Sequence, residues 1–184
     1  MYKILSLNSL ISAYTMSALY LDGVKMGDYQ ATSLGLGISI LFMMLSFSKP
    51  LKNLERERPP TSIFHWSLVI SVSVQFAVHL SVLLYFVHIC EPYIDRENDE
   101  SLAHDGEFKP NLKNSVMFIY QWWLQTTVIF VNYSGRPFME DIMEQKKLKW
   151  QLTFMFFMAT CCIFDVSEDL REMLELVPFP TEEF

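Results

Sequence analysis

The chain has 184 residues, of which 51% are hydrophobic and 15% aromatic, and its formal net charge is −7. This length suffices for one ordinary domain, but the charged residues are gathered in segments between long apolar stretches. A soluble globular protein is disfavoured, because apolar helices would fill most of so short a chain and leave little to cover them. Nucleic-acid binding is also disfavoured, since the basic residues flank the apolar stretches and form no basic stripe.

Five stretches contain no Asp, Glu, Lys or Arg apart from Lys149 at the edge of the last one. They are Ile4–Leu21, Thr32–Phe47, Ile63–Cys90, Val116–Val131 and Leu148–Phe164. A bilayer core takes roughly 20 apolar helical residues. The third stretch is long enough, and the second, fourth and fifth reach this length with flanking residues. We therefore expect an all-α fold, a polytopic membrane helical bundle of about five transmembrane helices, with soluble buried helices as the alternative.

The expected organisation divides the chain into helices and loops. It has two transmembrane helices in 1–47, a loop in 48–62, a third helix in 63–90, an acidic loop in 91–115, a fourth helix in 116–131, a loop in 132–149, a fifth helix in 150–166 and a tail in 167–184. Basic residues in short loops mark the cytosolic side. Most of them lie in 48–62 and 132–149, so we expect these two loops in the cytosol and the acidic loop and the tail in the lumen.

The first expected helix carries a polar stripe at helical spacing, formed by Asn8, Ser12 and Thr15. Polar groups in hydrocarbon must find partners, so this stripe is expected to face other helices or a wet cavity. Close packing between helices is one interpretation. The other is a lining for a transported species, which makes these three residues the candidate substrate-cavity residues.

Signatures of catalysis are missing from the sequence. It contains no P-loop, GxSxG, HExxH or Gly-rich dinucleotide turn. The three cysteines lie in or at the ends of apolar stretches and fit no zinc site. Asp95–Gly106 is rich in carboxylates but lacks the residue order of an EF-hand. We expect no catalytic residue, no metal site and no cofactor in this chain.

Four blocks resemble a known family: Met1–Asp28, Lys49–Pro59, Glu107–Ser115 and Asn132–Met139. They are similar to the C-terminal membrane region of type V P-type ATPases, and most of all to subfamily A, the endoplasmic reticulum branch. The motif residues within two of the blocks are Lys49, Pro50, Arg56, Glu57, Arg58, Pro59, Asn132, Gly135, Pro137 and Phe138. The resemblance implies a structural role for them.

The resemblance implies that the chain is a fragment holding spans five to nine of a P-type ATPase, with its tail before a last helix. The phosphorylation, nucleotide-binding and actuator domains would lie outside it. The fragment is then expected to be inactive alone, whereas the intact protein would hydrolyse ATP with Mg²⁺.

Members of subfamily A extract misinserted transmembrane helices from the endoplasmic reticulum membrane. The resemblance thus implies a multi-pass translocase of that membrane, with the bilayer, the rest of the polypeptide and client helices as partners. The client cavity of the family lies among its first six spans, so 1–47 would contribute to it and the other helices would support it. One alternative is a cation-transporting P-type ATPase, which the absence of acidic residues within the spans disfavours. Another is a stand-alone membrane scaffold or accessory subunit without enzymatic activity.

Overall fold

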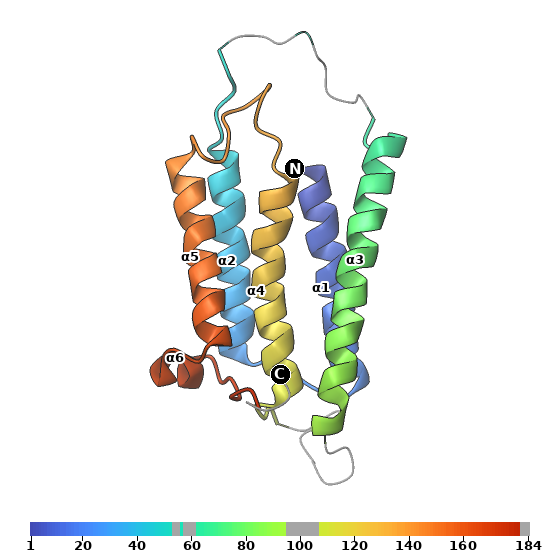
Figure 1. Ribbon diagram of the computed structural model, residues 1–184, viewed down its shortest axis with the longest axis vertical. Helices are drawn as coiled ribbons and strands as arrows, with labels where there is room; N and C mark the ends of the chain where they lie inside the picture. Colours follow the sequence, from blue (N-terminus) through green and yellow to red (C-terminus); the bar gives the residue numbers. More distant parts are fainter. Residues whose placement is uncertain (53–55, 57–61, 95–106, 181–184) are drawn as a thin grey trace.

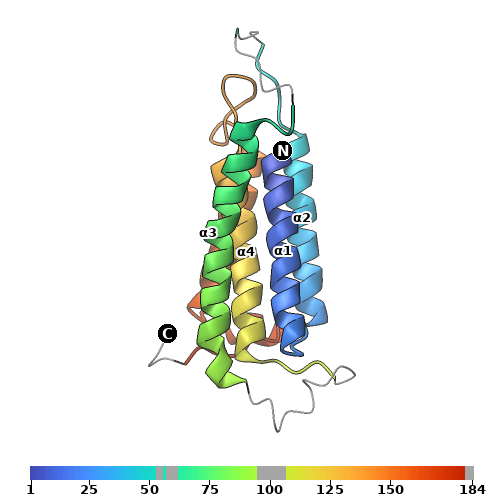
Figure 2. The ribbon, with the colours of Figure 1, turned by 90° about the vertical axis from the view of Figure 1, so that its right-hand side faces the viewer.

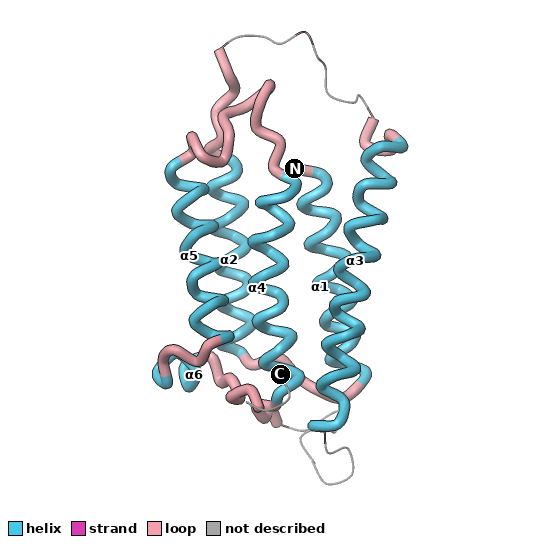
Figure 3. The backbone as a smooth tube through the Cα atoms, in the orientation of Figure 1, coloured by secondary structure: helices cyan, strands magenta, loops and turns pink. Residues whose placement is uncertain are grey.

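The computed structural model describes residues 1–52, 56, 62–94 and 107–180 (Figure 1). Five long helices form a bundle: α1 (Tyr2–Leu21), α2 (Asp28–Ser46), α3 (Trp66–Cys90), α4 (Leu112–Asn132) and α5 (Lys146–Ile163). A one-turn 3₁₀ helix, η1 (Glu91–Tyr93), and the short helix α6 (Glu168–Met173) complete the secondary structure. The described residues contain no β-strand (Figure 3).

The five long helices fall on the five predicted stretches, but some begin at other residues. α4 begins at Leu112 rather than Val116, because the Asn111 side chain caps it by accepting a 2.8 Å hydrogen bond from the Asn114 amide. α5 begins at Lys146, within the segment predicted as a loop. The tail contains α6, which the sequence did not indicate.

Three helices, α1, α2 and α3, are long and apolar enough to cross a membrane. α4 and α5 run alongside them through the same bundle (Figures 1 and 2) but do not meet that criterion. α5 has Lys146, Lys147 and Lys149 near its start. α4 lies in contact with all four other long helices, so many of its polar side chains meet protein rather than lipid. The prediction of an all-helical membrane bundle is confirmed.

α4 stands in front of α1 and α2 and between α3 and α5 in the view of Figure 1. α1 packs on α3 and α4, whereas α2 packs on α5 and α4. Gly37 of α2 marks the closest part of this packing: a Cβ added there would lie 3.3 Å from Met155 and 3.5 Å from Trp122. A small residue at this position lets α2 approach both α4 and α5.

The connections divide between the two ends of the bundle. The N-terminus, the α2–α3 loop and the α4–α5 loop lie at one end, which we call the basic end (Figures 1 and 2). The end of α3 with η1, the start of α4 and α6 lie at the other, which we call the opposite end. This agrees with the predicted grouping of the loops. That the basic end faces the cytosol stays a prediction from its Lys and Arg residues.

Asn132 provides a test of this orientation, because Asn132-Tyr133-Ser134 is a glycosylation sequon. The Asn132 amide is engaged with α3: its Nδ2 donates to Gln75 Oε1 at 2.7 Å, and its Oδ1 accepts from Gln75 Nε2 at 3.0 Å. We expect no glycan on Asn132 in the intact protein expressed in eukaryotic cells, as measured by mass spectrometry of the peptide with and without glycosidase.

A matched control is Glu100→Thr, which creates a glycosylation sequon at Asn98 in the α3–α4 loop. That sequon should carry glycan, because the loop would face the lumen. Glycan on Asn132 combined with an unmodified Asn98 would show that the orientation is reversed.

Candidate functional site

The predicted polar stripe of α1 faces the interior of the bundle. Asn8 is 3% exposed and Thr15 is 0% exposed. The half-buried Ser12 donates a hydrogen bond to Gln121 Oε1 of α4 at 3.2 Å. The Thr15 hydroxyl donates to the carbonyl of Ile11 in its own helix at 2.9 Å. The structure therefore brings the three residues onto the packed side of α1 and not onto its open surface.

The Asn8 amide on this packed side lacks partners among the described residues, and so does the amide oxygen of Gln125 in α4. α1 and α4 run antiparallel, so Asn8, one turn before Ser12, lies near the level of Gln125, one turn after Gln121. Both polar atoms of the Asn8 side chain and the Oε1 of Gln125 are buried without a hydrogen bond. An unsatisfied buried polar group costs about 1–3 kcal/mol. The packing of α1 is thus less favourable at Asn8 than at Ser12, whereas the Gln125 oxygen lies beside α2, 3.7 Å from the Cβ position of Gly37.

The exposed side of α1 carries a stripe of small residues among larger apolar ones. Ser9, Ala13 and Ser17 recur at every fourth position, and all three are exposed. Near the opposite end a hollow of about 740 Å³ opens between α1 and α2. Its lining includes Ser17 of α1 and Ala31 of α2, so the two helices share one open surface.

α2 continues this surface toward the basic end. Gly35 lies one turn beyond Ala31, and a Cβ added to it would meet nothing within 4 Å. Ser39, one turn further, is exposed as well. Small residues allow another helix to approach closely within a membrane. We call the set Ser9, Ala13, Ser17, Ala31, Gly35 and Ser39 the outer face of α1 and α2.

A buried ion pair ties α1 to α4 at the opposite end. Lys113, in the first turn of α4, is 1% exposed. Its ammonium group pairs with the carboxylate of Asp22 just after α1 and donates to the carbonyl of Ala18 at 3.1 Å. A buried charge is tolerated only when it is paired and hydrogen-bonded. The pair therefore holds the end of α1 against the start of α4.

An amide network beside this ion pair adds α2 and the tail. Gln30 is 0% exposed, and its Nε2 donates to Asn114 Oδ1 at 2.7 Å and to the Leu174 carbonyl at 2.9 Å. Asn114 Nδ2 donates to the Lys25 carbonyl at 2.7 Å. The network thus joins the α1–α2 turn, the start of α4 and the segment after α6. We call it, with the Lys113–Asp22 pair, the polar clamp.

The family motifs of the two basic-end loops lie against each other. Pro50 and Met139 form an antiparallel bridge. It is extended by hydrogen bonds from Leu51 N to the Phe138 carbonyl at 3.1 Å and from Glu140 N to the Lys49 carbonyl at 3.0 Å. Of the motif residues, Lys49, Pro50 and Phe138 thus lie in the contact between the two loops, and their structural role stays a prediction.

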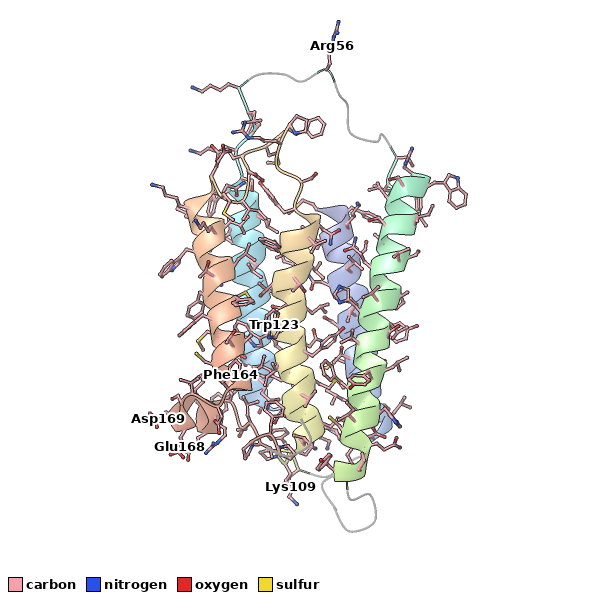
Figure 4. The ribbon with its side chains drawn as sticks, in the orientation of Figure 1. Arg56, Lys109, Trp123, Phe164, Glu168 and Asp169 are labelled. Carbon is pink, nitrogen blue, oxygen red and sulfur yellow. The ribbon has the colours of Figure 1, made fainter. Side chains whose placement is uncertain are left out.

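Gly135 is required by the turn that follows. A Cβ at this position would lie 2.8 Å from the Cα of Asp141 and 2.9 Å from the Glu140 carbonyl, which leaves no room for a side chain. Pro137 lies in the same turn, after a cis peptide bond. Arg56 extends away from the basic end (Figure 4). Glu57, Arg58 and Pro59 lie outside the described residues.

An exposed ion pair flanks this turn. The backbone amide of Asp141 donates to Glu144 at 3.1 Å, and the guanidinium of Arg136 pairs with the same carboxylate. Together, the amide first and the guanidinium second, they lower the pKa of Glu144. The carboxylate thus stays ionised and bound to the turn.

The sequence did not reveal the polar clamp. Asp22 and Lys113 are 91 positions apart. In the sequence, each is simply a charged residue at the edge of an expected membrane span. A signal was present: opposite charges stand at the same end of two antiparallel helices. It could be used only once those helices were known to be neighbours.

The chain is similar to curated proteins along nearly its whole length, whereas no family model matches it. It is 42% identical over 185 residues to the endoplasmic reticulum transmembrane helix translocase spfA of Aspergillus fumigatus, covering 99% of this chain and 14% of that protein. It is 41% identical to the probable manganese-transporting ATPase PDR2 of Arabidopsis thaliana, covering 98% of this chain and 15% of that protein. It is 39% identical to the endoplasmic reticulum transmembrane helix translocase of Saccharomyces cerevisiae, covering 100% of this chain and 15% of that protein.

The bundle and its clamp define a multi-pass helical membrane protein in which α4 is the central helix. The similarities then give the family: the chain belongs to the type V P-type ATPases of subfamily A. It spans only 14–15% of the length of these relatives. Two of the relatives carry the endoplasmic reticulum in their names, in agreement with the expected localisation.

The polar clamp gives a stability prediction. Lys113→Met in the intact protein should lower the free energy of unfolding by about 3 kcal/mol, because it leaves the Asp22 carboxylate without its buried partner. The double variant Lys113→Met with Asp22→Asn should recover part of this loss, since the carboxylate that lost Lys113 is then replaced by a neutral amide. Thermal unfolding in a mild detergent measures both.

The matched control is Lys146→Met, which removes an exposed lysine from the start of α5. It should change the stability by no more than about 0.5 kcal/mol. Equal effects of Lys113→Met and Lys146→Met would contradict the assignment of a buried, paired charge to Lys113.

Proposed function

We propose that the intact protein is an ATP-driven helix translocase of the endoplasmic reticulum membrane and that this chain supplies part of its membrane domain. The observation that carries the proposal is the 42% identity, over 99% of this chain, to a protein named as an endoplasmic reticulum transmembrane helix translocase. ATP and Mg²⁺ would bind to parts of the intact protein outside these residues. Client helices would enter through the membrane.

Within this chain we assign the client-facing surface to the outer face of α1 and α2. An incoming helix needs small residues for close approach and hydroxyl groups for hydrogen bonds, and Ser9, Ala13 and Gly35 offer these on open surface. Asn8, Ser12 and Thr15, the candidate substrate-cavity residues, lie on the packed side of α1, where Ser12 donates to Gln121 of α4. Ser12 is proposed to hold α1 against α4 through this bond.

The remaining helices would act as support. α3, α4 and α5 pack around α1 and α2 from one side, and the polar clamp holds the α1–α2 turn to α4 and the tail. α1 and α2 could then change their tilt or separation along the outer face while this end stays joined. Such a change would couple client binding to turnover only if the client contacts differ between conformations.

Cation transport is the second candidate, because one relative is named as a probable manganese-transporting ATPase. A site for a hard divalent cation requires several oxygen ligands. The described residues of this chain contain no group of three or more His, Cys, Asp or Glu side chains that could hold a metal ion. This favours the helix translocase for the part of the membrane domain that the chain forms.

Substitutions at neighbouring residues on the two sides of α1 distinguish a role in client binding from a role in helix packing. In the intact protein reconstituted in vesicles, Ser9→Leu and Ala13→Leu should reduce the stimulation of ATP hydrolysis by a client transmembrane peptide by about fivefold, which corresponds to a loss of about 1 kcal/mol. Thermal stability should be unchanged, because a leucine side chain is favourable on a surface that contacts lipid.

The matched controls are Asn8→Leu and Ser12→Leu, one residue away on the packed side. Ser12→Leu should lower stability by about 0.6–2 kcal/mol through loss of its bond to Gln121. Asn8→Leu should raise stability, because it removes an unsatisfied amide. Both should leave client stimulation intact.

If the packed-side variants abolish stimulation and the outer-face variants do not, the assignment of the client surface is wrong. Stimulation by Mn²⁺ in the absence of any client peptide would favour cation transport instead.

A further inference from the structure

A second open surface lies on the front of the bundle, between α4 and α5. It is a groove of about 320 Å³ next to the basic end. Its lining includes Thr127, Phe130, Ile142, Lys149 and Leu152. Figure 4 places Trp123, which also lines the groove, between α4 and α5.

The floor and walls of the groove are apolar. The rings of Trp123 and Phe156 meet edge to face, with their centroids 4.7 Å apart, and close the deep end of the groove. The hydroxyl groups of Thr126, Thr127 and Thr153 donate to carbonyls of their own helices, so they present their methyl groups. Along α5 the groove runs from Lys149 to Phe156, about 10 Å at the helical rise. Its shape and chemistry suit a hydrocarbon chain.

A positive charge stands where the groove opens at the basic end. Lys149 lines the groove and is exposed, and no ion pair joins it to a carboxylate in the described part of the chain. The nearby carboxylate of Glu144 forms an ion pair with Arg136. Trp150 beside it is 74% exposed, as is typical of tryptophans at a membrane interface. The groove thus combines an apolar slot with a cation at its basic end.

We propose that this groove binds one acyl chain of an anionic glycerophospholipid, with its phosphate against Lys149. The inference is independent of what the protein translocates. Lipid tails are as apolar as the groove, so burial alone gives no preference over bulk lipid. The preference comes from the lysine, which attracts the acidic headgroup.

A phospholipid fits the groove better than a further protein helix. Packed helices lie 8–10 Å apart and interdigitate their side chains along many turns. A helix seated here would cover Lys149, and a buried ammonium group needs a paired carboxylate. A lipid phosphate satisfies the same charge while leaving it at the interface.

The test measures lipids retained by the intact protein. The protein is purified from vesicles containing equal amounts of phosphatidylserine and phosphatidylcholine, and bound lipid is counted by mass spectrometry. We expect retention of phosphatidylserine over phosphatidylcholine in the unmodified protein. Lys149→Glu should reduce this retention by about fivefold or more. Lys146→Glu, an equal charge change on an exposed lysine that does not line the groove, should retain the lipid.

A second pair of variants tests the slot without changing charge. Thr153→Trp places a large side chain in the groove lining and should expel the lipid. Phe154→Trp, at the next residue, lies outside the lining and should not. Thermal unfolding of each variant checks that it is folded. An excess of inorganic phosphate should fail to displace the lipid, because phosphate has no acyl chain to fill the slot.

Four results would overturn the proposal. The first is equal retention of both lipids by the unmodified protein, which is also expected if another segment of the intact chain fills the groove. The second is an equal loss in Lys149→Glu and Lys146→Glu, which indicates only a diffuse surface charge. The third is full retention by folded Thr153→Trp, and the fourth is displacement by inorganic phosphate, which indicates an anion site without an acyl slot.

Discussion

The bundle depends on keeping the Lys113 ammonium group paired, because a lone charge at this depth would be too costly to bury. Its partner Asp22 lies at the end of α1, and the neighbouring Gln30 and Asn114 amides reach the α1–α2 turn and the tail. One cluster therefore positions four separate segments. α4, which begins in this cluster, contacts each of the other four long helices, and α1 also packs on α3 and α2 on α5.

The position of α4 explains its composition. A helix that touches four others can carry polar side chains, because partners in neighbouring helices are within reach: Gln121 meets Ser12, and Asn132 meets Gln75. Helices at the edge of the bundle meet lipid and must be apolar. α3 is such a helix, with most of its surface outside the core. Low hydropathy in α4 thus reflects a central position.

The two sides of α1 show why polarity alone misplaces a functional surface in a membrane protein. Asn8, Ser12 and Thr15 are the more polar set, yet they lie on the packed side of α1. There Ser12 bonds to α4, Thr15 bonds within α1, and Asn8 has no partner among the described residues. The exposed set is made of small residues that neither penalise contact with lipid nor block an approaching helix. The proposed client surface and the proposed lipid groove thus occupy different sides of the bundle and are open to separate tests.

The sequence by itself determined the helices, their order, the grouping of the loops and the family, because apolar length, charge position and motif similarity are local properties of the chain. It could not determine which face of α1 is buried, since a stripe such as Asn8–Ser12–Thr15 fits packing and a cavity equally well. It could not pair Asp22 with Lys113 or form the groove between Thr127 and Leu152. Those features depend on which helices are neighbours, and in a membrane that choice rests on long-range hydrogen bonds and close packing that only the tertiary structure contains.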